Sequence, residues 1–346
     1  MTDDGLVCVQ TTIQAPTASV RSFARVLSRI GARLIVVGDT KGPDRDGFDV
    51  GRLITIDEQR RLPFSLARSL PENHYARKNL GYLAAMAEGA YCIYETDDDN
   101  APLDSWRARQ ERVSAEPVQP RPWVNAYRLF SPETHIWPRG FPLELVRDAT
   151  TWDHKKSASE MRRAPIQQGL ADGSPDVDAV WRLVLDRGAP VNLGADTTRA
   201  FALPSGTWCP FNSQSTWWWP DAYPLLYLPS LCSFRMTDIW RSFIAQRCLW
   251  ELGLERVFVA PEVFQERNPH DLMRDFRDEI VGYECNRRLC SLLERTALES
   301  GPGSTVANLR TCYQALVASD LVPAAELRLV DAWIDDLSLL GYAKRR

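Results

Sequence analysis

Residues 90–100, Ala90-Tyr91-Cys92-Ile93-Tyr94-Glu95-Thr96-Asp97-Asp98-Asp99-Asn100, are the most informative part of the sequence. The first half is rich in tyrosine and isoleucine, which is typical of a buried strand. The strand ends in three consecutive carboxylates that repel one another, and a hard divalent cation is the usual partner for such clustered oxygens. Ligands of open α/β sheets bind beyond the carboxyl ends of the strands, so we expect a ligand site here.

Positive charge precedes this acidic strand. Arg77 and Lys78 stand at the start of a helical stretch, residues 80–88, that Gly89 is suited to end. A basic pair at a helix start can hold a phosphate, because the charge adds to the positive end of the helix. The acidic run alone could be a solvated loop. Together with the basic pair, it favours a site for Mg²⁺ or Mn²⁺ and a diphosphate.

The string YARKNLGYLAAMAEGAYCIYETDDDN, residues 75–100, resembles nucleotide-sugar glycosyltransferases of the GT-A fold. It is similar to the STELLO-type glycosyltransferase-like family and, more distantly, to the reversibly glycosylated polypeptide and UDP-arabinopyranose mutase group. By motif order the resemblance covers about residues 6–290. It implies an α/β fold with a mainly parallel central sheet flanked by helices, and a nucleotide-sugar donor. It also implies Mn²⁺ or Mg²⁺ at Asp99 with help from Asp97, and His270 resembles a late ligand of the metal or diphosphate.

Composition excludes several other classes of protein. A net charge of −4 argues against nucleic-acid binding, and 45% hydrophobic residues are ordinary for a globular protein. The eight cysteines form no CxxC motif, so free thiols in a reducing cytoplasm are expected. The acidic N-terminus does not resemble a signal peptide, and no apolar run approaches about 18 residues, so no transmembrane helix is expected. Plant relatives of the resembled family carry a membrane anchor, which we expect this chain to lack.

Three further strands are predicted before the acidic one, at residues 6–12, 33–37 and 53–56, with helices from residue 16 and residue 57. Residues 1–100 therefore form a predicted nucleotide-binding half, and residues 101–270 an acceptor and catalytic half. No linker separates the halves, so we expect them to share one sheet. The second half contains predicted strands at 125–130 and 256–259. Residues 271–346 are predicted to form helices at 271–293, 304–318 and 324–340.

Polar residues also follow the first two predicted strands. Asp39 can hydrogen-bond a ribose hydroxyl or a base N–H, or it can form a turn beside Gly38. The resemblance implies that this region faces the nucleoside. The predicted donor-binding residues are Thr11, Thr12, Asp39, Arg77, Lys78, Asp97, Asp98 and Asp99.

The acceptor half supplies candidates for binding sugar hydroxyls. Asp176 and Asp178 follow Pro175, where they can either contact hydroxyls or cap a helix, and the resembled family has a similar PDVDA stretch. The polar run 212–216 precedes three tryptophans, whose rings can stack on pyranose faces or pack in the core. The predicted sugar- and acceptor-binding residues are Gln168, Asp176, Asp178, Asn212, Gln214, Trp217, Trp218 and Arg241.

A strong helix pattern over residues 236–252 places Asp238 in a first helical turn. The helix dipole favours an acidic residue there, and the same field keeps the carboxylate ionised and able to accept a proton. Arg241, three residues on, faces the same way. The resemblance implies that Asp238 is the catalytic base of an inverting enzyme. Arg77 is predicted to stabilise charge on the departing diphosphate.

These observations predict a cytoplasmic, metal-dependent glycosyltransferase that moves a sugar from a nucleotide-diphosphate sugar, most simply a UDP-sugar, to an acceptor hydroxyl. One alternative is a UDP-sugar mutase or self-glycosylating protein. Another is a non-catalytic scaffold of the same fold. Donor turnover in the absence of an acceptor distinguishes these alternatives.

Overall fold

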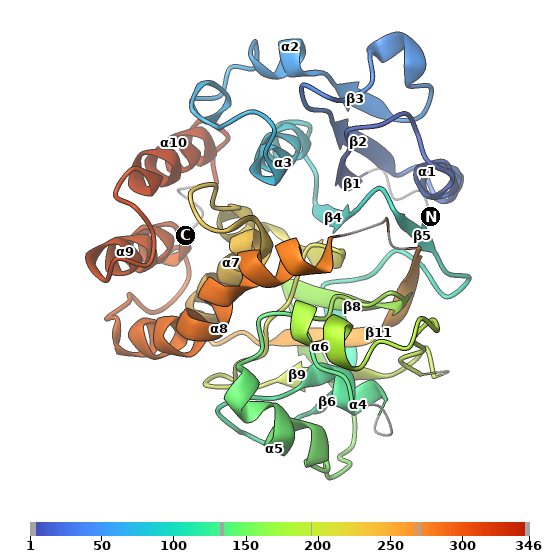
Figure 1. The fold of residues 1–346 in the computed structure, drawn as a ribbon. Coiled ribbons are helices and arrows are strands. Elements are labelled where there is room, and N and C mark those ends of the chain that lie inside the picture. Colours follow the sequence, from blue (N-terminus) through green and yellow to red (C-terminus); the bar gives the residue numbers. More distant parts are fainter. Residues whose placement is uncertain (1–4, 132–134, 195, 267, 269–270, 343–346) are drawn as a thin grey trace.

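The computed structural model describes residues 5–131, 135–194, 196–266, 268 and 271–342. Within them, eleven strands form one sheet in the order β3-β2-β1-β4-β10-β8-β11-β9-β6-β7, with β5 paired to β11. Figure 1 shows this sheet crossing the molecule, with helices on both of its faces. The predicted α/β class and the sharing of one sheet by both halves are confirmed.

Four parallel strands form the N-terminal part of the sheet: β1 (Leu6–Thr11), β2 (Arg33–Val37), β3 (Arg52–Ile54) and β4 (Cys92–Thr96). Alternate residues of β1 point to opposite faces, as the pleat requires. Leu6 and Cys8 share a core with helix α1 (Ala18–Arg29), and Val7 and Val9 share one with helix α3 (Lys78–Ala87). The sequence predicted this layer closely.

Helix α3 lies close to the sheet because it contains Gly81. A Cβ atom at that position would lie 2.6 Å from Cγ1 of Val9 and 2.7 Å from Cγ2 of Val37. Only a residue without a side chain fits at such a short separation. This close packing brings the N-terminus of α3, with Lys78, against the carboxyl end of β4.

The second half changes strand direction, so the sheet is mixed rather than mainly parallel. Strand β10 (Ser215–Trp218) lies antiparallel between β4 and β8 (Ile166–Gly173). Strand β11 (Arg256–Gln265) runs parallel to β8 and antiparallel to β9 (Ala200–Leu203). The outer strands are β5 (Asn100–Pro102), β6 (Arg112–Pro117) and β7 (Glu160–Arg163).

The strand predicted at 125–130 was wrong, because Ala126–Phe130 forms the short helix α4. Its aromatic residues favour a strand locally, but its buried positions 126, 127, 129 and 130 follow helical spacing. The amide of Asn125 donates to the carbonyl of Ile136 at 2.7 Å and holds the preceding turn. Three more short helices are α2 (Ile56–Gln59), α5 (Val146–Thr151) and α6 (Ala179–Val184).

The three predicted C-terminal helices are confirmed. They are α8 (Leu272–Arg295), α9 (Thr305–Ala318) and α10 (Glu326–Leu339), and they gather beside α7 (Thr237–Glu251) in Figure 1. Their apolar residues, Leu289, Leu316 and Trp333 among them, belong to the same hydrophobic core as β1 and α3. The division of the chain at residue 270 stays a prediction, and the core continues across that point.

Two buried carboxylates of α10 hold backbone segments of the rest of the chain. Asp336 accepts the N–H groups of Ser65 and Leu66 at 2.6 and 2.9 Å. Glu326 accepts those of Ser230 and Leu231 at 3.2 and 2.8 Å. Because these groups lie away from water, each such bond is costly to lose.

The predicted free thiols are confirmed, since all eight cysteines lie within the described residues and none forms a disulfide. Among the helices that the structure describes, none is both long enough and apolar enough to cross a membrane.

Candidate active site

A cavity of about 610 Å³ opens at the carboxyl ends of β1, β2, β4, β8 and β11, beside the N-terminus of α7. The predicted site residues that line this cavity are Thr11, Thr12, Asp39, Arg77, Asp97, Asp98, Asp99, Asp176, Asn212, Gln214 and Asp238. Sequence reasoning had missed another set of lining residues, which includes Tyr75, Arg139, Arg182, Phe234, Arg235 and Gln265.

The acidic triplet lines this cavity, and each of its carboxylates has a partner. Asp97 Oδ1 accepts from the hydroxyl of Tyr75 at 2.9 Å and from Nζ of Lys78 at 3.2 Å. Asp98 Oδ2 accepts from the hydroxyl of Thr12 at 2.6 Å. Lys78 is fully buried and does not line the cavity, so its charge acts through Asp97.

Asp99 is the least satisfied of the three carboxylates. Its Oδ2 accepts from the amide of Gln265 at 3.0 Å, but its Oδ1 is buried without a hydrogen-bond partner among the described residues. Burial, followed by repulsion from Asp97, raises the pKa of Asp99 to about 7. A buried oxygen without a donor, in a group that resists ionisation, is what a bound cation would relieve.

The triplet therefore fits a divalent cation, though not as a complete protein cage. No group of three or more His, Cys, Asp or Glu side chains that could hold a metal occurs among the described residues. Mg²⁺ commonly uses one or two carboxylates and takes its remaining ligands from substrate phosphates and water. Asp99 and Asp97 match that pattern. The third predicted ligand, His270, lies outside the described residues.

Asp39 and Arg77, both predicted to bind the donor, lie near each other in the wall of the cavity. Asp39 follows β2 and accepts from the backbone N–H groups of Thr40, Asn73 and His74 at 2.7, 2.8 and 2.9 Å. Two of these three bonds, those from Asn73 and His74, order the loop before α3. The predicted turn role and the predicted ligand role of Asp39 are compatible, because the side chain also lines the cavity.

Arg77 lies near Asp39 rather than near the acidic triplet. Its Nε donates to Gln59 and its Nη1 donates to the carbonyl of Leu70 at 3.2 Å, while Nη2 has no partner within the described residues. Burial lowers the pKa of Arg77, with Asp39 opposing the shift. Arg77 precedes Lys78 in the chain, and it is Lys78 that turns toward Asp97. This arrangement does not support the predicted contact of Arg77 with the departing diphosphate.

Asp238 lines the same cavity and lies in the first turn of α7, as predicted. Three donors converge on its Oδ2: Nη2 of Arg139 at 2.9 Å, and the backbone N–H and hydroxyl of Ser213, each at 3.3 Å. Burial alone would raise the pKa of Asp238, but Arg139 outweighs it and the pKa is lowered. Asp238 is therefore ionised, and Oδ1 receives none of these three bonds.

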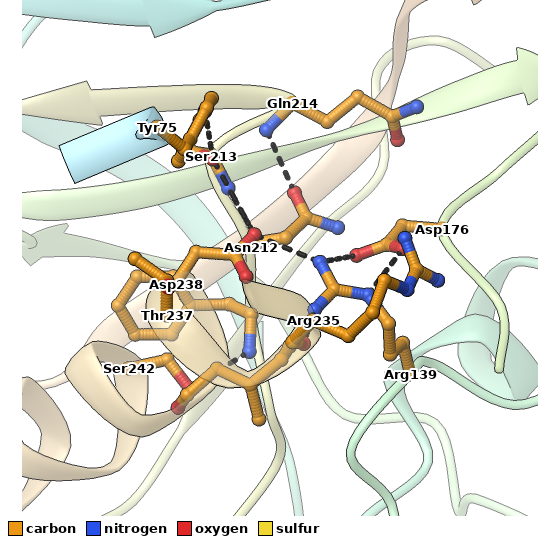
Figure 2. A network of polar contacts seen from close by, with 12 residues as sticks. Tyr75, Arg139, Asp176, Asn212, Ser213, Gln214, Arg235, Thr237, Asp238 and Ser242 are labelled. Carbon is orange, nitrogen blue, oxygen red and sulfur yellow. Dashed lines mark hydrogen bonds and ion pairs between the residues drawn. The ribbon is translucent and has the colours of Figure 1, made fainter. Parts of the chain in front are cut away.

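Arg139 joins Asp238 to Asp176, as Figure 2 shows. Its Nε and Nη2 donate to the two oxygens of Asp176, both at 2.8 Å, in a bidentate pair. Such forked pairs fix direction as well as charge. Asn212 and Gln214 lie next to this network, where the amide oxygen of Asn212 accepts from the backbone N–H of Gln214 at 3.0 Å.

Trp217 and Trp218 do not line the cavity, so stacking of sugar on them is not supported. Successive residues of β10 point to opposite faces of a sheet that is covered on both sides, and both indoles are fully buried. Their Nε1 atoms donate to the buried carboxylates of Glu262 and Glu95 at 2.9 and 2.8 Å. The packing alternative holds for both residues.

Three other predicted acceptor residues also lie behind the wall of the cavity. Arg241 pairs with Glu95 at 2.7 Å in the interior, because α7 is buried on nearly every face. Gln168 hydrogen-bonds Asn212 and Thr216 and so supports the wall from behind. Asp178 caps α6 by accepting from the N–H of Trp181 at 2.7 Å, and burial raises its pKa to about 7. The capping alternative holds for Asp178.

A mixed α/β structure with a large central sheet, and with acidic residues at a strand end, is consistent with the nucleotide-sugar transferase fold expected from the sequence. The family model described as STELLO glycosyltransferases matches residues 235–345. This match includes the C-terminal helices, so the resemblance extends beyond the predicted limit near residue 290.

Two proteins of Arabidopsis thaliana are similar to nearly the whole chain. Probable glycosyltransferase STELLO1 is 27% identical over 350 residues, covering 96% of this chain and 44% of that protein. Probable glycosyltransferase STELLO2 is 26% identical over 349 residues, with the same two coverages. The chain thus spans less than half the length of these relatives. The resemblance to STELLO-type glycosyltransferases expected from the sequence is confirmed.

Proposed function

We propose that the chain catalyses transfer of a sugar from a nucleotide-diphosphate sugar, a UDP-sugar, to an acceptor hydroxyl with inversion at the anomeric carbon. One observation carries the proposal. One cavity, among the described residues, is lined both by an acidic triplet with an unsatisfied carboxylate oxygen and by the ionised carboxylate of Asp238. Donor activation and proton acceptance need these two kinds of group on either side of a sugar.

The donor would lie along the ends of the parallel strands. The nucleoside could contact Thr11, Thr12, Asp39 and Nη2 of Arg77, which has no partner among the described residues. The diphosphate would lie beside the acidic triplet. Mn²⁺ or Mg²⁺, held by Asp99 with Asp97 and a predicted contribution from His270, would neutralise charge on the diphosphate.

The acceptor would lie between the donor sugar and Asp238. Its hydroxyl oxygen attacks the anomeric carbon from the side opposite the diphosphate, so that a new C–O bond forms as the bond to the diphosphate breaks. The bonding electron pair leaves with UDP, and the hydroxyl proton passes to Oδ1 of Asp238. Arg139 and Ser213 hold Oδ2 and so orient the other oxygen. Asp176, Asn212 and Gln214 are available to the hydroxyls of the two sugars.

Turnover of defined donors tests this proposal. The protein is incubated with UDP-glucose, UDP-galactose, UDP-xylose and UDP-arabinopyranose plus Mn²⁺, with and without a panel of methyl glycosides, and UDP release and sugar products are measured. Slow hydrolysis that becomes transfer with an acceptor supports the proposal. Interconverted ring forms without an acceptor indicate a mutase, and no turnover indicates a scaffold. The cytoplasmic location stays a prediction.

A further inference from the structure

The hydroxyl of Tyr75 lies between Asp97 of the acidic triplet and Ser213, which contacts Asp238. Tyr75 precedes α3 in the short 3₁₀ turn Tyr75–Arg77, and its oxygen lies 2.9 Å from Asp97 Oδ1 and 2.5 Å from Ser213 Oγ. Ser213 in turn lies 3.3 Å from Asp238 Oδ2. An unbroken path of hydrogen bonds thus runs from the acidic triplet through two hydroxyl groups to Asp238, and Figure 2 shows its Tyr75–Ser213–Asp238 part.

The path holds fewer hydrogens than contacts. Tyr75 and Ser213 carry one hydroxyl hydrogen each, whereas three contacts separate Asp97 from Asp238 along the path. Two oxygens 2.5 Å apart need a hydrogen between them, so the Tyr75–Ser213 contact always uses one. The remaining hydrogen points either from Tyr75 to Asp97 or from Ser213 to Asp238. One carboxylate gains a hydroxyl bond only when the other gives it up.

Lys78 cannot fill the gap by turning, because its three hydrogens are already used. Its Nζ donates to the carbonyl of Thr96 and to the oxygen of Tyr75, both at 2.8 Å, and to Asp97 at 3.2 Å. The side chain is fully buried and fixed in place. It holds the Tyr75 oxygen while leaving the direction of the Tyr75 hydrogen free.

We propose that Tyr75 is a positioning residue that couples the donor site to Asp238 through Ser213. When a cation is bound at the triplet together with the donor, Asp97 would use its electron pairs on that cation, and the hydroxyl hydrogens of Tyr75 and Ser213 would then both point toward Asp238. The carboxylate gains the Ser213 hydroxyl bond at Oδ2 and presents Oδ1 to the acceptor. This inference rests on the proposed function. It adds that Asp238 is oriented to accept a proton only when the donor is bound.

The test compares Tyr75→Phe, Ser213→Ala and the double variant with the wild type. The readouts are kcat and KM for the best UDP-sugar and methyl glycoside pair, Kd for UDP with Mn²⁺, and melting temperature. Each single variant should lower kcat about tenfold, the scale of one hydrogen bond to a charged group, with KM and Kd within about threefold. The double variant should be no slower than either single variant, because both break one path.

A second measurement needs no turnover. Coupling between sites is reciprocal, so Asp238→Asn should change the affinity for UDP with Mn²⁺ by about fivefold in the wild-type background and not in Tyr75→Phe. The matched control is Tyr313→Phe, which removes a buried hydroxyl without a hydrogen-bond partner among the described residues, outside the cavity. It should leave kcat, KM and Kd unchanged.

Several results would overturn the coupling. The first is a normal kcat in Tyr75→Phe. The second is a double variant in which the two reductions in kcat multiply. The third is a reduction in kcat that is proportional to the reduction in melting temperature across the variants. If Tyr75→Phe does not fold, kcat of Ser213→Ala and the same affinity comparison in the Ser213→Ala background decide. A wild type that turns over none of the UDP-sugars refutes the proposed function, and the coupling with it. An active wild type with an equally active Tyr75→Phe refutes the coupling alone.

Discussion

Asp99 combines burial, crowding by like charges and an oxygen that no described residue hydrogen-bonds, which makes it sensitive to both pH and cations. Its pKa is about 7 in the folded protein against an ordinary value of 3.8, so the folded state holds the extra proton between these values. Its contribution to stability is therefore greatest at low pH and is lost as pH rises from about 4 to about 7. A bound cation would reverse the loss.

Asp99→Asn should therefore melt at a higher temperature than the wild type at pH 8 without metal. The stability of Asp99→Asn should also fall less than that of the wild type between about pH 4 and pH 7. Part of the fall remains in the variant, because Asp178 has a raised pKa as well. Added Mn²⁺ with UDP should raise the melting temperature of the wild type and not that of Asp99→Asn. Equal stabilisation of both proteins would remove Asp99 from the cation site.

The variant Asp238→Asn distinguishes a role of Asp238 as proton acceptor from a purely structural role. The amide keeps the size of the side chain and its place beside Arg139, but it cannot take a proton, so transfer should fall about a hundredfold or more. Donor affinity should change far less, since the triplet is intact. Transfer rate, UDP affinity and melting temperature are measured together. Near-normal transfer would move the role of base to Asp176, and a joint loss of melting temperature and activity would favour a structural role.

Substitution of Arg77 distinguishes its proposed contact with the nucleoside from the predicted contact with the diphosphate. If its unpartnered Nη2 contacts the nucleoside, Arg77→Lys should weaken UDP binding about tenfold while leaving Mn²⁺-pyrophosphate binding unchanged. Lysine retains the positive charge, so the comparison isolates the lost hydrogen-bonding fork. Calorimetric titration of both ligands measures this difference. Equal loss for UDP and pyrophosphate would restore the diphosphate role that the sequence predicted.

At the scale of the helix and the strand, α7 is attached to β4 through a buried ion pair. Arg241→Met should destabilise the fold by about 3–5 kcal/mol, because it leaves the carboxylate of Glu95 buried without its cation. Adding Glu95→Gln should recover most of the loss. Urea unfolding of the three proteins gives the energies. A small effect of Arg241→Met with a large effect on acceptor affinity would support the sugar-binding role that the sequence predicted.

Sequence reasoning predicted well those elements whose structure is determined by residues adjacent in the sequence. The triplet after β4 and Asp238 at the start of α7 follow from strand and helix patterns that a few adjacent residues specify. The tryptophans of β10 were misread because strand periodicity does not reveal whether one face or both faces are covered. Arg139 lies in a proline-rich loop without a pattern, and only the fold brings it to Asp238.

At the scale of the whole molecule, the core joins the C-terminal helices to the sheet. A protein ending at residue 270 would expose the apolar residues that meet Leu289, Leu316 and Trp333, so it should not unfold cooperatively. Near-UV circular dichroism and urea titration, with the full chain as control, measure this. A sharp transition in the shortened protein would instead establish residue 270 as a domain boundary.

The carboxylates of α10 also determine when the cavity can form during synthesis. Ser65–Leu66 precedes the loop that carries Leu70 and Arg77, and Ser230–Leu231 precedes Phe234 and α7. Both segments obtain their hydrogen-bond acceptors from Glu326 and Asp336, which are synthesised long after the segments themselves. A nascent chain therefore lacks these acceptors until α10 has emerged from the ribosome, and ligand binding in the cavity should begin only then.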